Sequence, residues 1–186
     1  MRKNVLLLSL FLTFFQFMSA QRIGRIEFEV GGGEVCPINN LGRPAYNGAL
    51  IFGEIRYNFN PKFDLGMNVM HSAYDRDYVD EHSIHSVRDY NITVFADYNL
   101  RQSELANVFF GPGIGWTYTY ERTNFYGWDE DQSIAGRGSL PMLAARMGIE
   151  FLDKLRVSFL YQIPYDGYKY QYTAISIGLV FGGKKK

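Results

Sequence analysis

The sequence predicts an all-β protein, an eight-stranded antiparallel up-and-down β-barrel that crosses a membrane. First, apolar side chains recur at every second position in one segment after another, as in strands with two unlike faces. Second, aromatic residues make up 17% of the chain while mean hydropathy is only −0.17, and no apolar run after residue 20 is long enough for a membrane helix. Third, the segments between the expected strands are alternately long and short, as the outer loops and inner turns of such a barrel are.

The N-terminus has the pattern of an export signal. Arg2 and Lys3 precede an apolar run, and Ser19-Ala20 offers a small residue for cleavage. We therefore expect residues 1–20 to be a cleaved signal peptide and residues 21–186 to be one barrel domain. An N-terminal membrane anchor is the alternative interpretation, although the run is short for a span.

Charge and cysteine content exclude some classes of protein. The chain has 19 basic and 19 acidic residues, so loss of Arg2 and Lys3 leaves 17 against 19 and a net charge near −2. Nucleic acid is therefore not an expected partner. Cys36 is the single cysteine, so no intrachain disulfide can form. We expect neither a cofactor nor a bound metal.

The first four strands are expected at about residues 23–35, 48–59, 63–74 and 87–100. Gly31–Gly33 should bend the first or form a bulge, and Asn60-Pro61-Lys62 should close the second with a tight turn. The fourth has the clearest alternation. The apolar faces carry Ile26, Phe28, Val30, Ile51, Ile55, Tyr57, Phe59, Phe63, Leu65, Met67, Val69, Tyr90, Ile92, Val94, Ala96, Tyr98 and Leu100. The polar faces carry Arg25, Glu27, Glu29, Glu54, Arg56, Asp64, Gly66, Asn68, Asp89, Asn91, Thr93, Phe95, Asp97 and Asn99.

The last four strands are expected at about residues 108–121, 140–152, 155–163 and 170–181. Glycine and threonine fill most of the polar face of the fifth, and Asp153-Lys154 is expected to form the hairpin turn between the sixth and seventh. The apolar faces carry Val108, Phe110, Ile114, Trp116, Tyr118, Tyr120, Leu143, Ala145, Met147, Ile149, Phe151, Val157, Phe159, Tyr161, Ile175, Ile177 and Leu179.

Alternation alone leaves open which face points inward. In a lipocalin-like barrel the apolar face would surround a ligand. The polar faces here are rich in glycine, alanine and serine and contain no lysine within a strand, which favours tight interior packing and an apolar face turned to lipid. Aromatic residues near the strand ends are expected to form interfacial girdles: Tyr57, Phe59, Tyr90, Tyr98, Trp116, Tyr118, Tyr120, Tyr161 and Tyr165.

The interior of so narrow a barrel should be filled by its own side chains. Because buried charges need partners, we predict a lumen network of salt bridges and water. Its members are Arg25, Glu27, Glu29, Glu54, Arg56, Asp64, Asp89, Asp97, Glu121, Arg146, Glu150 and Arg156. The alternatives are that several of these charges are solvated at the barrel mouths, and that the acidic excess lines a weak, gated cation path.

Catalytic signals are poor, and we expect no enzyme. His82-x-x-His85 lies near several acidic residues, but its spacing is generic, so solvated surface loops are the better interpretation. The loop residues expected on the surface are Tyr78, His82, His85, Tyr126, Trp128, Asp129 and Asp131. His71 shares the apolar face of Met67 and Val69, which argues against a lipase-like site.

The segment Tyr170–Phe181, with its alternating apolar residues and its terminal phenylalanine, resembles the assembly signal of bacterial outer-membrane barrels. The whole mature chain resembles the small OmpA/OmpX-type barrels of the Gram-negative cell envelope. That resemblance implies location in outer-membrane lipid, insertion by the barrel-assembly machinery, and a structural, adhesive or surface-interaction role. A partner outside the cell or in the envelope would bind the loops, and we expect a monomer. The alternatives are a narrow pore for cations or small solutes, a soluble periplasmic lipocalin-like carrier and a membrane-embedded lipid-modifying enzyme.

Overall fold

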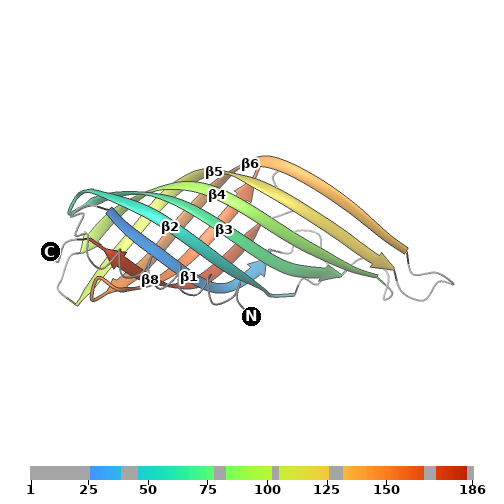
Figure 1. Ribbon diagram of the computed structural model, residues 1–186, viewed down its shortest axis with the longest axis horizontal. Coiled ribbons are helices and arrows are strands. Elements are labelled where there is room, and N and C mark those ends of the chain that lie inside the picture. The colour runs from blue at the N-terminus through green and yellow to red at the C-terminus, as the bar shows by residue number, and fades with distance from the viewer. Residues whose placement is uncertain are drawn as a thin grey trace, which may run out of the picture.

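The computed structural model describes residues 26–38, 46–77, 83–101, 105–125, 132–165 and 171–183. These residues form β1 (Ile26–Pro37), β2 (Gly48–Asn60), β3 (Phe63–Asp77), β4 (Ser83–Arg101), β5 (Ala106–Phe125), β6 (Gln132–Phe151), β7 (Leu155–Pro164) and β8 (Tyr172–Gly182). Each strand pairs with the next in antiparallel orientation, and β8 returns to β1, so the barrel is closed (Figure 1). The predicted all-β, eight-stranded up-and-down barrel is therefore confirmed. The described part of the chain contains no apolar helix of membrane-spanning length.

The two ends of the barrel differ. One end, here the short-turn end, holds the start of β1, the end of β8 and the tight connections β2–β3 and β6–β7; the other is the long-loop end. The β6–β7 turn lies one residue earlier than expected, because Leu152 and Asp153 adopt φ of 52° and 53° and the Lys154 amide donates to Phe151 O at 2.9 Å. Left-handed conformations at both central residues match the twist of a hairpin.

The pairing of β1 runs through its three glycines without a shift in register, so the expected bulge is absent. A Cβ at Gly33 would collide with the backbone of β8 around Ile175 and Ser176. Glycine at this position therefore permits close approach of two strands.

Several strands are longer than their side-chain pattern predicts. β6 begins at Gln132, eight residues before the expected start at 140, because its backbone pairs with β5 without interruption from Phe125↔Gln132 to Ala106↔Phe151. β7 ends at Pro164, opposite Met142. Among the described residues, segment 132–140 of β6 therefore has a neighbouring strand on one side only. β4, β5 and β6 stay paired up to the row of Ser83, Phe125 and Gln132, and Figure 1 shows the β5–β6 hairpin reaching farther than β1 and β8 at the end away from the C-terminus.

The apolar faces point outward. Ile92, Ile175 and Leu179 are 55%, 54% and 52% exposed, whereas Thr93 and Ala174 beside them are buried. The interior has two layers. Towards the long-loop end lies an apolar cluster of Val35, Leu50, Met70, Tyr74, Val87, Tyr172 and Ala174. Towards the short-turn end the interior side chains are mostly charged.

Candidate functional site

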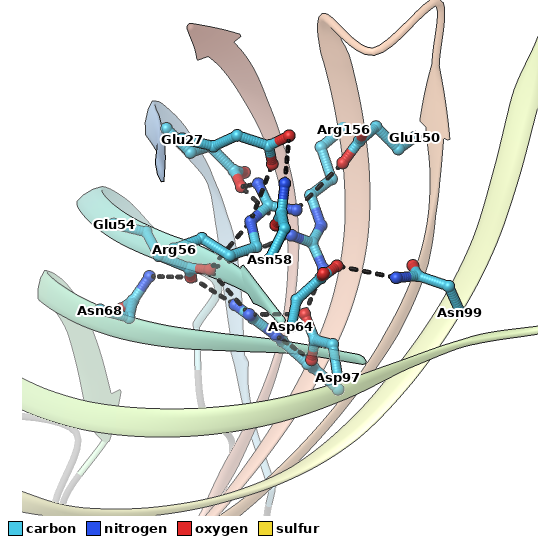
Figure 2. Close-up of polar contacts among 12 residues, drawn as sticks. Glu27, Glu54, Arg56, Asn58, Asp64, Asn68, Asp97, Asn99, Glu150 and Arg156 are labelled. Carbon is cyan, nitrogen blue, oxygen red and sulfur yellow. Dashed lines mark hydrogen bonds and ion pairs between the residues drawn. The ribbon is translucent and has the colours of Figure 1, made fainter. Parts of the chain in front are cut away.

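The charged layer forms the most distinctive group of side chains in the molecule (Figure 2). Strands β1, β2, β4, β6 and β7 each place side chains in it, because alternate positions of every strand point to the interior. All its members are buried. We call it the lumen cluster, and it comprises Glu27, Glu29, Glu54, Arg56, Asp97, Arg146, Glu150 and Arg156.

Arg56 bridges strands that are not neighbours in the sheet. Its Nη2 donates to Glu29 Oε2 at 3.0 Å, and its Nη1 donates to Glu150 Oε2 at 3.0 Å. Its Nε lies 3.5 Å from a Glu27 carboxylate oxygen and 3.8 Å from one of Glu54. One guanidinium thus joins β1, β2 and β6 across the lumen.

Arg146 holds two carboxylates at once. It makes a bidentate contact with Glu54, in which Nη2 donates to Oε1 at 2.8 Å. Towards Asp97, Nε donates to Oδ1 at 3.0 Å and Nη2 to Oδ2 at 2.8 Å. Such paired, charge-assisted bonds are the strong form of an arginine–carboxylate contact.

Two phenylalanine rings complete the cluster. Arg146 lies over the Phe95 ring, with Cζ 4.0 Å from the centroid, and Arg156 lies over the Phe109 ring at 3.4 Å. Arg156 also donates to Asp97 Oδ2 at 2.5 Å. The weakly hydrated faces of the guanidinium groups are therefore covered by aromatic carbon, while their edges meet carboxylates.

Sequence reasoning did not place the inward-facing rings of Phe95 and Phe109 in the site. Phe95 lies opposite Gly113 and Phe109 opposite Gly148 in the register. A Cβ would lie 2.6 Å from the Phe95 ring at Gly113 and 2.5 Å from the Phe109 ring at Gly148. A signal for these rings is present in the sequence: each is a large side chain on a strand face that otherwise carries small or polar residues, and a neighbouring strand has a glycine opposite it.

A small cavity lies beside the lumen cluster. The cavity beside it, lined partly by Glu29, Asn68 and Arg146, holds about 20 Å³, the size of one water molecule. Five carboxylates surround three guanidinium groups, so with all groups ionised the cluster carries two excess negative charges. This arrangement of ion pairs links different strands across the interior and fills that part of the lumen.

Three more residues of the predicted network lie among the described residues, each with a polar neighbour. Asp64 accepts from Asn99 Nδ2 at 2.7 Å, and Asp89 accepts from Thr119 Oγ1 at 2.7 Å. Glu121 is close to the long-loop end, beside His85. Arg25 lies outside the described residues.

The interpretation of His85 as a loop residue is wrong, because β4 already begins at Ser83. Its side chain is buried, with Nδ1 2.8 Å from Thr123 Oγ1 and Nε2 3.3 Å from Glu121 Oε2. Strand pairing between β4 and β5 places it there, since His85 lies opposite Thr123. The other residues expected in surface loops, Tyr78, His82, Tyr126, Trp128, Asp129 and Asp131, lie outside the described residues. Within the described ranges, no three His, Cys, Asp or Glu side chains gather as a metal site would require.

The expected girdle residues lie on the outside of the barrel and are exposed or half-buried. At the short-turn end, Tyr57 and Phe59 pack edge to face at 4.8 Å, and Tyr98 packs on Phe63 at 4.9 Å. Tyr161 is half-buried, and its hydroxyl donates to Gln171 Oε1 at 3.3 Å. The remaining members, Tyr90, Trp116, Tyr118, Tyr120 and Tyr165, lie nearer the long-loop end.

A closed eight-stranded antiparallel barrel with an apolar outside and a charged, filled inside is the fold of the small OmpA/OmpX-type outer-membrane barrels. Solved structures of such barrels are similar to this chain in fold. Ail, the attachment invasion locus protein of Yersinia pestis, solved in complex with the heparin analogue sucrose octasulfate, matches with a TM-score of 0.56 and 14% identity over 85% of this chain and 97% of Ail. Neisserial surface protein A matches with a TM-score of 0.53 and 13% identity over 84% of this chain and 96% of that protein. No family model matches the sequence, and no curated protein matches it.

Proposed function

We propose that this chain is an integral outer-membrane protein with a plugged lumen, which acts through the surface that it presents beyond the membrane. It would be exported by the signal peptide at residues 1–20, inserted by the barrel-assembly machinery, and monomeric. Its role would be structural or adhesive, in the cell envelope. The fold that it shares with Ail and Neisserial surface protein A supports this proposal.

The outer apolar band carries the argument. On β4 the outward residues from Tyr90 to Leu100 are uncharged, and they cover roughly 33 Å along the strand at about 3.3 Å per residue. With a tilt of roughly 40°, that length corresponds to roughly 25 Å along the barrel axis, the height of the lipid-facing band in outer-membrane barrels. A continuous exposed apolar surface of this extent is unfavourable in water and favourable in lipid.

The interior geometry weighs against the other functions. A lipocalin-like carrier needs an apolar cavity, whereas the lumen holds the charged cluster and, above it, the packed apolar cluster around Met70 and Tyr172. A pore needs a continuous water path, whereas the cavity beside Arg146 holds one water.

Membrane fractionation and conductance together test the proposal. We expect the protein in the outer-membrane fraction, with a gel mobility that shifts on boiling as a folded barrel unfolds. In planar bilayers the folded protein should be electrically silent. Recovery in the soluble periplasmic fraction contradicts the membrane assignment, and reproducible cation-selective steps contradict the plugged lumen.

The edge of β6 at residues 132–140, which has no strand beside it on one side among the described residues, is the specific feature that favours a surface interaction. The Tyr165 amide donates to Pro141 O at 2.8 Å, so the backbone groups of Pro141 face away from β5. Because direction alternates along a strand, Arg137 and Ser139 also turn their backbone groups to the open edge. No heavy atom lies within 4 Å of a Cβ built at Gly136 or Gly138. An extended segment of a partner protein could therefore pair with this edge by β-augmentation.

A proline scan with a matched control tests the edge. Ser139→Pro and Ser139→Ala both remove the hydroxyl that accepts from Trp116 Nε1, but only proline also removes the amide that faces the open edge. Extended peptides selected from a displayed library on the reconstituted barrel should bind the alanine variant and lose binding to the proline variant. Equal binding to both variants contradicts the edge as the binding site.

A further inference from the structure

A groove of about 680 Å³ lies on the outer wall of the barrel and crosses β4, β5, β6 and β7. One side of it is a row of outward apolar side chains that are neighbours in the strand register, Val94, Ile114, Leu143 and Ile163. The other side is formed by Pro141 and Tyr165, which lie two residues closer to the long-loop end. We call the space between these six residues the outer groove.

The groove exists because two residues of the next row do not fill it. Pro141 has only a compact ring, and Trp116, opposite it on β5, is turned away. The Trp116 indole donates to Ser139 Oγ, and Ser139 lies two residues farther towards the long-loop end on the same face of β6. Outward rows two residues apart along a strand are separated by roughly 6.6 Å, so the space left here is about as wide as one hydrocarbon chain.

The outer groove lies within the apolar band and not at its edge. Val94 is four residues from Tyr90, the first residue of that band on β4, and both point outward. Four residues correspond to roughly 13 Å along a strand and, with a tilt of about 40°, to roughly 10 Å along the barrel axis. The side chains that line the groove are apolar, apart from the aromatic ring of Tyr165 at its rim. A polar occupant would lose its hydrogen bonds with water there, so the lining selects a hydrocarbon.

We propose that the outer groove binds one straight, saturated acyl chain of a membrane lipid in the half of the bilayer nearer the long-loop end. The inference rests on the proposed membrane function. The row from Val94 to Ile163 extends over three strand spacings, roughly 14 Å in total, so it contacts a long part of the chain. A chain in the groove has protein atoms on two sides, whereas a chain over the rest of the wall has them on one side, and each added contact contributes dispersion energy. The chain in the groove therefore exchanges with bulk lipid more slowly than its neighbours do.

The width of the groove determines which chain is preferred. Two walls roughly 6.6 Å apart admit an unbranched chain, whereas methyl branches widen a chain at each branch point. In an enclosed apolar pocket, one misfitting methylene changes binding by about tenfold or more. The groove is open towards lipid, so we expect a smaller preference, about fivefold, for an unbranched over a methyl-branched chain.

Fluorescence quenching of Trp116 in lipid vesicles tests the site, because Trp116 lies beside the groove, opposite Pro141. The chain has two tryptophans, so every variant also carries Trp128→Phe, which makes Trp116 the single reporter. The folded barrel is placed in vesicles of phosphatidylcholine with brominated chains, which quench tryptophan on contact. Dipalmitoyl or diphytanoyl phosphatidylcholine is then added at low mole fraction, and the recovery of fluorescence gives the affinity of each competitor relative to the host lipid. The two competitors share a headgroup and a main-chain length and differ in methyl branches.

The dipalmitoyl lipid should bind about fivefold more tightly than the diphytanoyl lipid to the barrel that carries only Trp128→Phe. Leu143→Phe and Val94→Phe each place a larger ring in the groove, and each should bring the ratio of the two affinities to about one. Ile55→Phe is the matched control and should keep the ratio of about fivefold. Ile55 is exposed on β2, in the same row as Val94 through Met67 of β3, but two strands away from β4.

The outcomes separate this inference from the proposed function. A ratio near one without a groove substitution overturns it, as does an unchanged ratio in both filled variants or a lost ratio in Ile55→Phe. The same two chains on phosphatidylglycerol should give the same ratio, and a ratio that depends on the headgroup overturns the assignment to an acyl chain. Loss of quenching as the protein-to-lipid ratio rises assigns the groove to a second copy of the chain and also overturns it. All these results are compatible with a boiling-dependent gel shift, whereas loss of that shift in the wild-type protein contradicts the membrane barrel itself.

Discussion

Arg146→Ala is the sharpest test of the lumen cluster. The change removes bidentate contact with Glu54, two hydrogen bonds of 2.8 and 3.0 Å to Asp97 and the stacking on Phe95. Asp97 keeps Arg156, but Glu54 keeps only Asn68 at 3.2 Å and distant guanidinium groups at 3.8 and 4.0 Å. Removing one partner of a buried ion pair costs about 3 to 5 kcal/mol. Because Asp97 is still paired, we expect a loss near the lower value, about 3 kcal/mol.

The free energy of unfolding can be measured by urea titration in lipid vesicles, with the folded fraction read from gel mobility without boiling. Lys62→Ala is the matched control, since that lysine side chain is exposed in the β2–β3 turn, and it should change stability by less than about 0.5 kcal/mol. A loss below about 1 kcal/mol for Arg146→Ala, or one equal to that of Lys62→Ala, refutes the view that the lumen cluster cross-links the barrel.

Two further substitutions test the outer face and the packing of the rings. Ile177→Arg places a charge on the outward side of β8 and should cost about 2 to 4 kcal/mol in vesicles if that side meets lipid; a cost below about 0.5 kcal/mol in the same urea titration contradicts contact with lipid. Gly113→Val should cost about 1 to 3 kcal/mol by overpacking against Phe95, and Phe95→Ala in the same chain should recover part of that loss. Gly138→Val, in open space on the protruding hairpin, is its control and should be near neutral; equal effects at the two glycines contradict the ring contact.

The two faces of the barrel could be predicted because they depend on a local rule. From Tyr90 to Leu100 the alternation is uninterrupted, and the structure turns its apolar side outward along β4. The number of strands and their order followed from the same pattern and from the turns between them. The inward side chains of this strand, such as Thr93 and Asp97, are buried for the same reason.

The ends of strands were predicted less well. Residues 132–139 contain glycine and serine and show no alternation of large and small residues, so they were expected to form a loop. Hydrogen bonding to β5 extends β6 through them regardless, because a backbone ladder requires partners and not particular side chains. Arg137 therefore lies in β6 and His85 in β4, although both were expected in loops.

The sequence by itself determined that this chain has eight two-faced strands with their apolar sides outward, because an alternation with a period of two can be recognised from neighbouring residues. Only the tertiary structure decided that Arg56 contacts Glu150 and that Arg146 binds both Glu54 and Asp97. Those contacts depend on the stagger between strands that are far apart in the chain, and this stagger is a property of the whole closed barrel.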